Sequence, residues 1–240
     1  MKWAWIDQVI KNGLLTCYYQ LIVDREEKIY AYEILSRFKK EDGTLIYPNI
    51  IFEAAKTRGR LYELDRLCRL TAIRYATHLN GKKAFINFIP MSIYSPEFCL
   101  QSTTRLSSQL GVDPSQLVFK VVETEKVDDL EHLKSILTYY GDGGFRYALD
   151  DVGEGYSTIE MLEAIKPHYM KLDMKFVQGI SENKNKQHIA KQFLQKSKEI
   201  GSIPLAEGVE FSEDFERLKQ VGIKLFQDYL FGKPSPRPKY

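Results

Sequence analysis

The chain alternates between short apolar runs and longer segments in which apolar residues recur at helical spacing. Short apolar runs bounded by polar residues are typical of buried strands, and the segments between them fit amphipathic helices. This alternation predicts repeated strand–helix units. Eight strands are expected, at Tyr18–Val23, Ile29–Leu35, Ala84–Asn87, Leu117–Val122, Arg146–Leu149, Tyr169–Leu172, Ile203–Ala206 and Lys224–Phe226.

Helices are expected between these strands, at Tyr62–His78, Leu130–Tyr140, Asn185–Ile200 and Ser212–Val221, the last with Ser212 as its cap. Eight strands are enough to close a barrel. Residues 24–28 alone join the first two strands, which is too short for the crossover that parallel neighbours need. The pattern therefore predicts an α/β fold, a TIM-like (β/α)8 barrel with one antiparallel strand.

The pattern continues without a linker, a low-complexity tract or an internal repeat, and the Pro-rich stretch GKPSPRPKY falls at the end of the chain. We therefore expect a single domain over residues 1–240. The apolar share of 44% and the charged share of 28% are ordinary for a globular domain with a sizeable core.

The charge balance limits the classes of binding partner, and the cysteines limit the kinds of site that the chain can form. The 34 basic and 32 acidic residues leave a net charge of +2, which is too balanced to indicate DNA or a membrane surface as the partner. The cysteines Cys17, Cys68 and Cys99 are odd in number and widely spaced, so they predict neither a zinc site nor a disulfide framework. With no signal peptide or membrane span in the sequence, a cytoplasmic location is expected.

Polar side chains recur at the ends of the expected strands, where barrels of this type carry their active sites. One of them, Glu33, lies inside an apolar strand, where an unpaired carboxylate would be costly. The others are Asn87, Lys120, Glu123, Asp150, Asp151, Lys171, Asp173, Glu207 and Gln227. Taken singly, each has an ordinary explanation, such as a helix cap for an Asp or a surface position for a Lys. Their joint placement on seven of the eight strands favours a common site.

So many carboxylates close together predict a metal site, because they repel one another unless a cation binds between them. The four histidines, His78, His132, His168 and His188, show no ligand spacing and fit ordinary surface or helix positions. Oxygen-only ligands favour Mg²⁺ or Mn²⁺ over zinc. Two such ions can activate water and stabilise a leaving oxygen in phosphodiester cleavage.

The sequence resembles the EAL-domain family, phosphodiesterases that linearise the bacterial messenger cyclic di-GMP. AYEILSRF is similar to the signature strand of the family, with Glu33 and Leu35 kept and Ile34 in place of alanine. The stretches FINFIP, YALDDVGEGYST, YMKLDMKFV, PLAEGVE and FQDYLFGKP resemble the other motifs in family order. The resemblance runs from about Leu14 to Pro234.

The resemblance implies a metal-binding role for Glu33, Asn87, Asp150 and Asp151, with Asp150 bridging two ions. It implies a catalytic role for Glu207, at the second metal or as general base.

The resemblance further implies that Lys171 orients the attacking water or a phosphate oxygen. Arg37 and Gln227 are the ligand-binding positions, with Arg37 contacting a ligand phosphate. Glu123 would support the loop VGEGYST, which in the family also serves dimer contact, so a homodimer is expected.

Lys120 departs from the family pattern. The fourth strand of the family reads Glu-x-Thr-Glu, and alignment on Pro114 and Leu117 places Lys120 at the first glutamate, a ligand of the first metal. Milder departures are Asp228 in place of a glycine, Ile89 in place of a serine, and Val152 and Glu154 in the loop after the aspartates. An ammonium at Lys120 opposes a divalent ion at about 4 Å by roughly 8 kcal/mol at an effective dielectric near 20. It could instead pair with Glu33 and Asp150 and stand in for the cation.

Three functions stay open from the sequence. The first is two-metal hydrolysis of cyclic di-GMP to linear pGpG, impaired by Lys120. The second is a non-hydrolytic cyclic di-GMP receptor or protein-interaction module on the same fold. The third is a barrel glycosidase that uses Glu123 and Glu207, although the tryptophans Trp3 and Trp5 lie before the barrel rather than in a sugar cleft.

Overall fold

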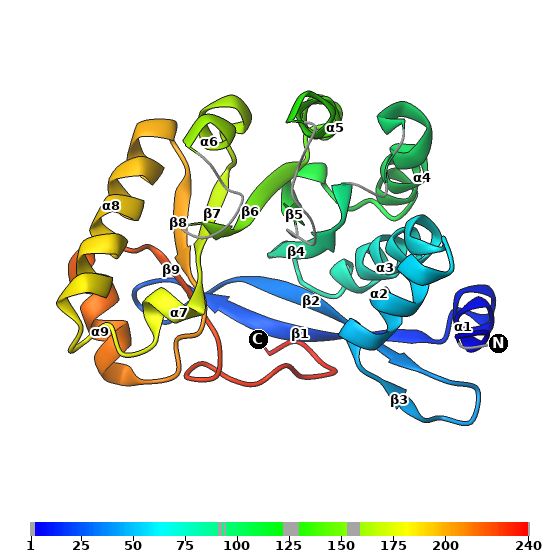
Figure 1. Cartoon of the computed structure of the whole chain (residues 1–240), viewed down its shortest axis with the longest axis horizontal. Helices are drawn as coiled ribbons and strands as arrows, with labels where there is room; N and C mark the ends of the chain where they lie inside the picture. The colour runs from blue at the N-terminus through cyan, green and yellow to red at the C-terminus, as the bar shows by residue number, and fades with distance from the viewer. Residues whose placement is uncertain (1–2, 91–92, 94, 122–129, 153–158, 240) are drawn as a thin grey trace.

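The computed structural model describes residues 3–239 apart from 91–92, 94, 122–129 and 153–158, and only the backbone of residues 151, 152, 159 and 160. Nine strands form one sheet in the order β1-β9-β8-β7-β6-β5-β4-β2-β3, and an additional β1–β2 pairing closes eight of them into a barrel (Figure 1). The strands are β1 (Leu15–Val23), β2 (Ile29–Lys39), β3 (Leu45–Ile46), β4 (Lys83–Phe88), β5 (Leu117–Val121), β6 (Arg146–Val152), β7 (Tyr169–Leu172), β8 (Ile203–Ala206) and β9 (Leu225–Gln227).

Strand direction follows the prediction. β1 runs antiparallel to both of its barrel neighbours, β2 and β9, whereas the pairings from β2 through β4 to β9 are parallel. The tight β1–β2 connection is held by the Asp24 carboxylate, which accepts hydrogen bonds from the backbone N–H groups of Glu26 and Lys28. The barrel with one antiparallel strand is confirmed. The short β3 pairs with β2 outside the barrel.

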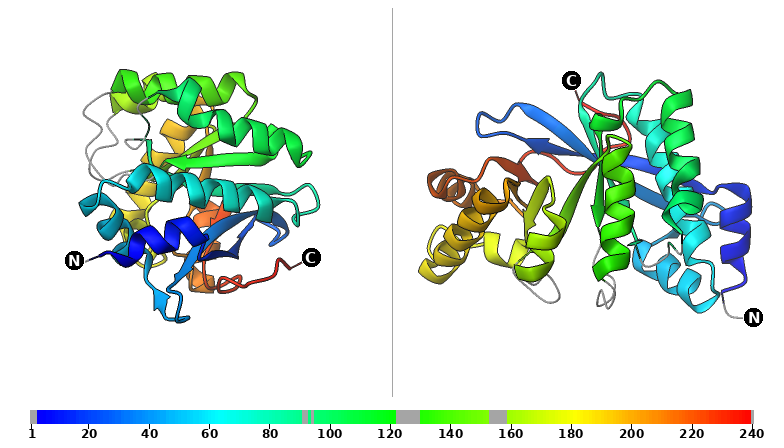
Figure 2. Two further views of the ribbon diagram at one scale, coloured as in Figure 1. Left: turned by 90° about the vertical axis from the view of Figure 1, so that its right-hand side faces the viewer. Right: turned by 90° about the horizontal axis from the view of Figure 1, so that it is seen from above.

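Helices cover the outside of the strands, as the two further views show (Figure 2). They are α1 (Trp5–Asn12), α2 (Pro48–Thr57), α3 (Leu61–Ala76), α4 (Pro96–Gln109), α5 (Leu130–Asp142), α6 (Ile159–Ile165), α7 (Met174–Val177), α8 (Lys184–Ile200) and α9 (Ser212–Val221), with a 3-10 turn, η2, at Pro114–Gln116. The four expected helices are present within two residues at each end.

Local chemistry sets several helix ends. Asn183 caps α8 by accepting from the backbone N–H groups of Asn185 and Lys186, and Gly201 ends it in the left-handed conformation. The expected cap of α9 is wrong. Ser212 is the first residue of that helix, Phe211 holds the cap position, and the Ser212 hydroxyl donates to the Glu213 side chain instead.

The C-terminal segment covers β1, which has no crossover helix of its own. Tyr19 and Ser235 exchange two backbone hydrogen bonds of 2.7 and 3.0 Å, and the Tyr32 hydroxyl donates to the Lys239 carbonyl. Figure 1 shows this red segment running beside the β1–β2 hairpin. The Pro-rich end of the chain therefore belongs to the fold. Across the described part of the chain, no helix is long and apolar enough to cross a membrane.

His168 supplies a pH test at the end of the barrel away from the strand C-termini. It is half-buried, and its Nδ1 accepts a hydrogen bond from the Tyr147 backbone N–H at 3.3 Å. Burial, together with the charges of Arg146 and Lys83, lowers the pKa of His168 to about 4. The unfolded chain takes up this proton near pH 6.5. Between these values the unfolded state binds more protons, so this contribution to stability is lost as the pH falls.

We expect urea unfolding to show a larger loss of stability from pH 7 to pH 5 in the parent chain than in His168→Asn. The asparagine amide oxygen can accept the Tyr147 hydrogen bond but does not titrate, so the comparison isolates the imidazole. Equal losses in the two proteins would contradict the assignment.

Candidate functional site at the strand ends

Two layers of side chains fill the barrel. Because side chains alternate across a strand, residues two apart face the same side. The first layer is apolar and consists of Ile22, Ala31, Phe85, Val118, Ala148, Tyr169, Leu205 and Leu225. The residues two positions further along each parallel strand are polar, and they form a second layer at the strand C-termini together with Gln20 of β1. This site layer consists of Gln20, Glu33, Asn87, Lys120, Asp150, Lys171, Glu207 and Gln227.

Lys120 lies between two carboxylates. Its Nζ is 2.8 Å from Glu33 Oε1 and 2.6 Å from Asp150 Oδ2, and all three residues are buried. Burial opposes the charged form of Lys120, but Asp150, Glu33 and Glu207 outweigh it and raise the lysine pKa well above its usual value. Lys120 is therefore a charged ammonium that pairs with Glu33 and Asp150, the arrangement given above as the alternative to a bound cation.

The two carboxylates stay ionised for the same reason. Burial by itself raises the pKa of Glu33 and of Asp150, but the charges of Lys120 and Lys171 outweigh it and lower both pKa values. In Glu33 a hydrogen bond from Gln227 adds to this effect. Each partner thus keeps the other charged in a place where an isolated charge would be very costly.

Lys171 is the second cation of the layer. Its fully buried Nζ lies 2.6 Å from Glu207 Oε2, 3.5 Å from Glu33 Oε2 and 3.4 Å from Asp150 Oδ1. Burial lowers its pKa, but Asp150 and Glu33 outweigh this, so the pKa is raised overall. The three carboxylates and two ammonium groups leave one net negative charge.

Gln227 connects Glu33 to β1. Its Nε2 donates to Glu33 Oε2 at 2.5 Å and to Gln20 Oε1 at 3.4 Å. Gln20 in turn donates to Asp228 at 3.0 Å. Neither Gln20 nor Asp228 was predicted as a site residue. A lone polar residue within the apolar run TCYYQLIV was the available signal for Gln20, but β1 is antiparallel, so Gln20 does not fall at the end of its strand.

Asn87 lies beside Lys120, as its register partner on the neighbouring strand. Its Oδ1 is buried and accepts no hydrogen bond from the residues that the structure describes. An oxygen in this state is a possible cation ligand, but the cation next to it is Lys120.

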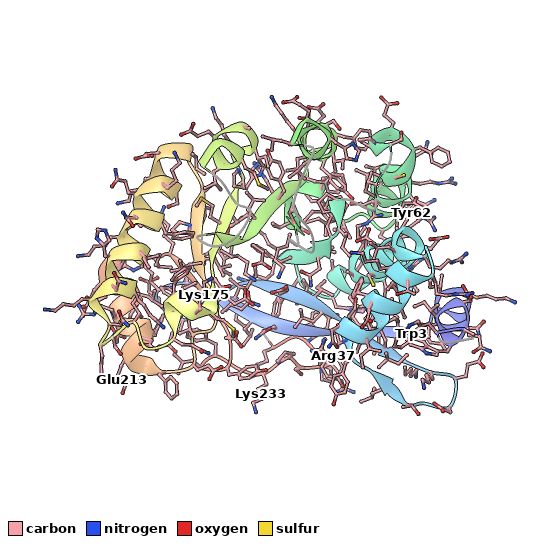
Figure 3. All side chains as sticks on the ribbon, viewed as in Figure 1. Trp3, Arg37, Tyr62, Lys175, Glu213 and Lys233 are labelled. Carbon is pink, nitrogen blue, oxygen red and sulfur yellow. The ribbon has the colours of Figure 1, made fainter. Side chains whose placement is uncertain are left out.

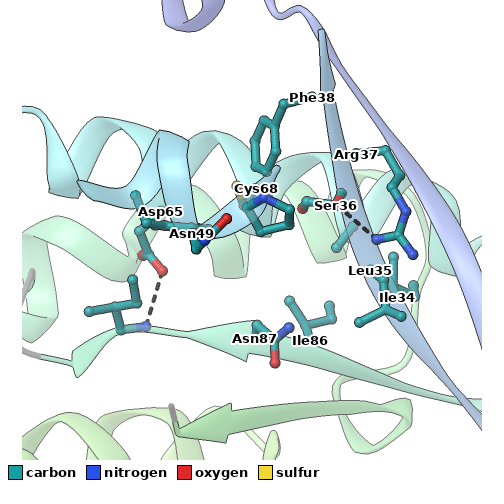
Figure 4. Close-up of a pocket in the computed structure, with 14 residues that line it drawn as sticks. Ile34, Leu35, Ser36, Arg37, Phe38, Asn49, Asp65, Cys68, Ile86 and Asn87 are labelled. Carbon is teal, nitrogen blue, oxygen red and sulfur yellow. Dashed lines mark hydrogen bonds between the residues drawn. The ribbon is translucent and has the colours of Figure 1, made fainter. Parts of the chain in front are cut away.

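Arg37 does not join the charged cluster. It lies on β2 close to α2 (Figure 3), and it lines a largely apolar pocket of about 360 Å³ between β2, β4, α2 and α3. Its Nη1 donates to the Ser36 carbonyl at 3.0 Å (Figure 4), and the guanidinium lies over the Tyr18 ring. Asn87 lines the same pocket, so the pocket and the charged cluster adjoin.

Three other predicted positions have different outcomes. Asp173 is a helix cap, because its carboxylate accepts from the Lys175 N–H at 2.7 Å at the start of α7. Asp151 belongs to β6, but its side chain is not described. Glu123 lies outside the described residues, and so does the stretch VGEGYST except for Val152, whose backbone ends β6.

The described residues do not fit a divalent ion between Glu33 and Asp150. The Lys120 ammonium takes that place, at ion-pair distance from both carboxylates. No group of three or more His, Cys, Asp or Glu side chains within the described ranges is arranged to hold a metal. The site layer therefore contains its own cation.

Nearly the whole chain matches a known family. The model of the EAL domain matches residues 3–234. The chain belongs to the EAL domain family. This confirms the resemblance seen in the motifs, and the match begins earlier than the expected Leu14.

Relatives of this EAL domain act on or bind cyclic di-GMP. It is 30% identical over 233 residues to the probable cyclic di-GMP phosphodiesterase PdeG of Escherichia coli, covering 95% of this chain and 46% of PdeG. The chain spans less than half the length of the first curated relatives that it matches.

Solved structures agree with the fold. A standalone versatile EAL protein of Vibrio cholerae in its cyclic di-GMP-bound form is 32% identical with a TM-score of 0.81, covering 92% of both chains. The calcium and cyclic di-GMP complex of BlrP1 from Klebsiella pneumoniae is 28% identical with a TM-score of 0.82, covering 92% of this chain and 56% of BlrP1. In BlrP1 a divalent ion accompanies the nucleotide.

Proposed function

We propose that this EAL domain recognises cyclic di-GMP without a metal ion at the Glu33–Asp150 position and hydrolyses it slowly or not at all. The observation that carries the proposal is the Lys120 ammonium, 2.8 Å from Glu33 and 2.6 Å from Asp150. The relatives and solved structures that bind this nucleotide support the choice of ligand.

Electrostatics oppose a divalent ion beside Lys120. At about 4 Å and an effective dielectric near 20, the ammonium repels such an ion by roughly 8 kcal/mol, whereas a glutamate would attract it by a similar amount. Loss of the lysine proton would relieve the repulsion. The raised pKa of Lys120 and its two ion pairs make that loss costly.

Nucleotide binding uses residues outside the ion pairs of Lys120. Apart from its bond to Ser36, the Arg37 guanidinium makes no hydrogen bond to the described residues, so its remaining donors can meet a phosphate. The adjoining apolar pocket, lined in part by Leu35, Phe52 and Ile86, offers a surface for a base. Gln227, the other predicted ligand position, is committed to Glu33 in the free protein.

The alternative is an active phosphodiesterase that yields linear pGpG, with Glu207 as general base and Lys171 orienting the attacking water. In the structure these two side chains are paired with each other at 2.6 Å, which leaves Glu207 Oε1 as the oxygen for a water proton. None of the relatives described above is a glycosidase. The use of Mg²⁺ or Mn²⁺ by this chain, its action as one domain and its assembly as a homodimer stay predictions.

Calorimetry with cyclic di-GMP, in EDTA and then in Mg²⁺ or Mn²⁺, tests the proposal. We expect binding that the chelator leaves unchanged. Arg37→Ala should weaken it about tenfold or more, since a charge-assisted contact contributes about 1.5–3 kcal/mol. Arg25→Ala, at the opposite end of the barrel, is the matched control and should bind as the parent does.

Chromatography of the same mixtures reads hydrolysis. Release of linear dinucleotide at about 1 per second or more would show an ordinary enzyme and contradict the proposal. Absence of binding in both EDTA and metal would refute recognition itself.

A further inference from the structure

Asp228 adopts a backbone conformation that its residue type disfavours. It follows β9 directly and has φ +125°, a region that side chains other than glycine rarely occupy. The family motif that it resembles has glycine at this place. Such strain costs free energy and persists only where the surroundings hold the residue, which is a reason to ask what Asp228 does.

Both carboxylate oxygens of Asp228 are engaged within the barrel mouth. Oδ1 accepts from Gln20 Nε2 at 3.0 Å, and Oδ2 accepts from the Gly208 backbone N–H at 3.2 Å. The residue is only 9% exposed. Asp228 thus connects the middle of β1, the end of β9 and the loop that follows β8.

Gly208 cannot easily move away from this contact. Its φ is +79°, and a Cβ at this position would collide with Met174 at the start of α7. The backbone therefore passes tightly between Met174 and the Asp228 carboxylate. This fixes the peptide next to Glu207, whose side chain pairs with Lys171.

The chemistry of a carboxylate also decides which way two amides face. Asp228 Oδ1 accepts from Gln20, so Gln20 turns its NH₂ toward Asp228 and its oxygen away. That oxygen faces Gln227 Nε2, which donates to it at 3.4 Å and to Glu33 at 2.5 Å. An acceptor at each end, Asp228 and Glu33, therefore imposes one orientation on both glutamines.

Among the residues that the structure describes, no other hydrogen bond holds the orientation of the Gln227 side-chain amide. Its Oε1 is buried and accepts no hydrogen bond from the residues that the structure describes. The orientation of its amide therefore rests on Glu33 and Gln20, and that of Gln20 rests on Asp228.

We propose that Asp228 is a positioning residue of the site, which fixes Gln20 and through it the donation of Gln227 to Glu33, while holding the peptide after Glu207. The proposal predicts specific effects of two substitutions. Asp228→Asn keeps the shape but places a donor against either Gln20 or Gly208. Asp228→Gly removes both the carboxylate and the strain.

Nuclear magnetic resonance of the free protein tests this directly. The side-chain NH₂ signal of Gln227, assigned by its loss in Gln227→Leu, should shift in Asp228→Asn and in Asp228→Gly. In a Gln20→Met background, where the link is cut, Asp228→Asn should cause no further shift of that signal. Asp228→Gly should unfold at a higher urea concentration than Asp228→Asn, because it is free of the strain.

An unchanged Gln227 signal in both folded variants would overturn the proposal. So would a shift of equal size with and without Gln20, since the effect would then not pass through that residue. If neither variant folds, Asp228 serves folding and the positioning role is rejected.

A second measurement depends on the proposed function. Cyclic di-GMP affinity should fall about fivefold to tenfold in Asp228→Asn, the equivalent of one hydrogen bond. An unchanged affinity in the folded variant would count against a role in the site. If the parent chain does not bind the nucleotide, the proposed function fails and the resonance experiment still decides the role of Asp228.

Discussion

Lys120→Glu is expected to raise metal-dependent hydrolysis of cyclic di-GMP by about a hundredfold or more over the parent chain. The substitution replaces a cation by a carboxylate beside Glu33, Asn87 and Asp150, so the repulsion of a divalent ion becomes attraction. Each 1.36 kcal/mol removed from the barrier is a tenfold gain in rate. The ammonium repels a divalent ion by roughly 8 kcal/mol, and removal of a small part of this repulsion is enough for the expected gain in rate.

Two measurements separate binding from chemistry in this variant. Calorimetry should show Mn²⁺ binding that the parent lacks, and chromatography should show linear dinucleotide only when the metal is present. Lys134→Glu makes the same charge change on an exposed position of α5 and should leave both unchanged. A folded Lys120→Glu protein that neither binds Mn²⁺ nor hydrolyses the nucleotide would refute the assignment of this position.

Lys120→Met is expected to destabilise the fold by about 3–5 kcal/mol at pH 7. Removal of one partner from a buried ion pair leaves the other charge uncompensated, which is the costly case. Glu33 and Asp150 both lose their nearest cation, and Lys171 is farther from each of them, at 3.5 and 3.4 Å. The methionine fills much of the lysine volume, so the loss reports charge rather than packing.

Urea unfolding at pH 7 measures this effect against Lys134→Met, an exposed control for which a change within about 0.5 kcal/mol is expected. The double variant Glu33→Gln/Lys120→Met should be less destabilised than the sum of the two single variants, because the two residues interact directly. A loss below about 1 kcal/mol in Lys120→Met would mean that the ion pairs contribute little to folding.

The structure explains how a lysine is tolerated at this position. The site layer brings together the carboxylates of Glu33, Asp150 and Glu207, whose negative charges must be compensated. Lys120 on β5 supplies a cation from the chain itself. Its ammonium reaches two carboxylates at once and keeps both ionised. We predict that Lys120 keeps the barrel stable while it excludes an ion, and the two Lys120 variants measure these two effects separately.

The sequence by itself determined the barrel, its antiparallel strand and most of the site layer. These follow from local features, since short apolar runs mark the strands, and Asn87, Asp150 and Glu207 stand where such runs end. The length of one turn, residues 24–28, decided the strand direction. Lys120 was singled out because alignment on Pro114 and Leu117 places it at the first glutamate of the family's fourth strand.

Only the tertiary structure showed that Gln20 and Asp228 lie at the site and that Arg37 lies outside its charged cluster. Gln20 and Asp228 are 208 residues apart in the chain, and their contact exists because β1 closes the barrel against β9. Arg37, which the sequence groups with Glu33, extends into a neighbouring pocket, because it lies four residues further along β2. Contacts between distant segments depend on how the barrel closes, and no local pattern of residues records which side chains that closure brings together.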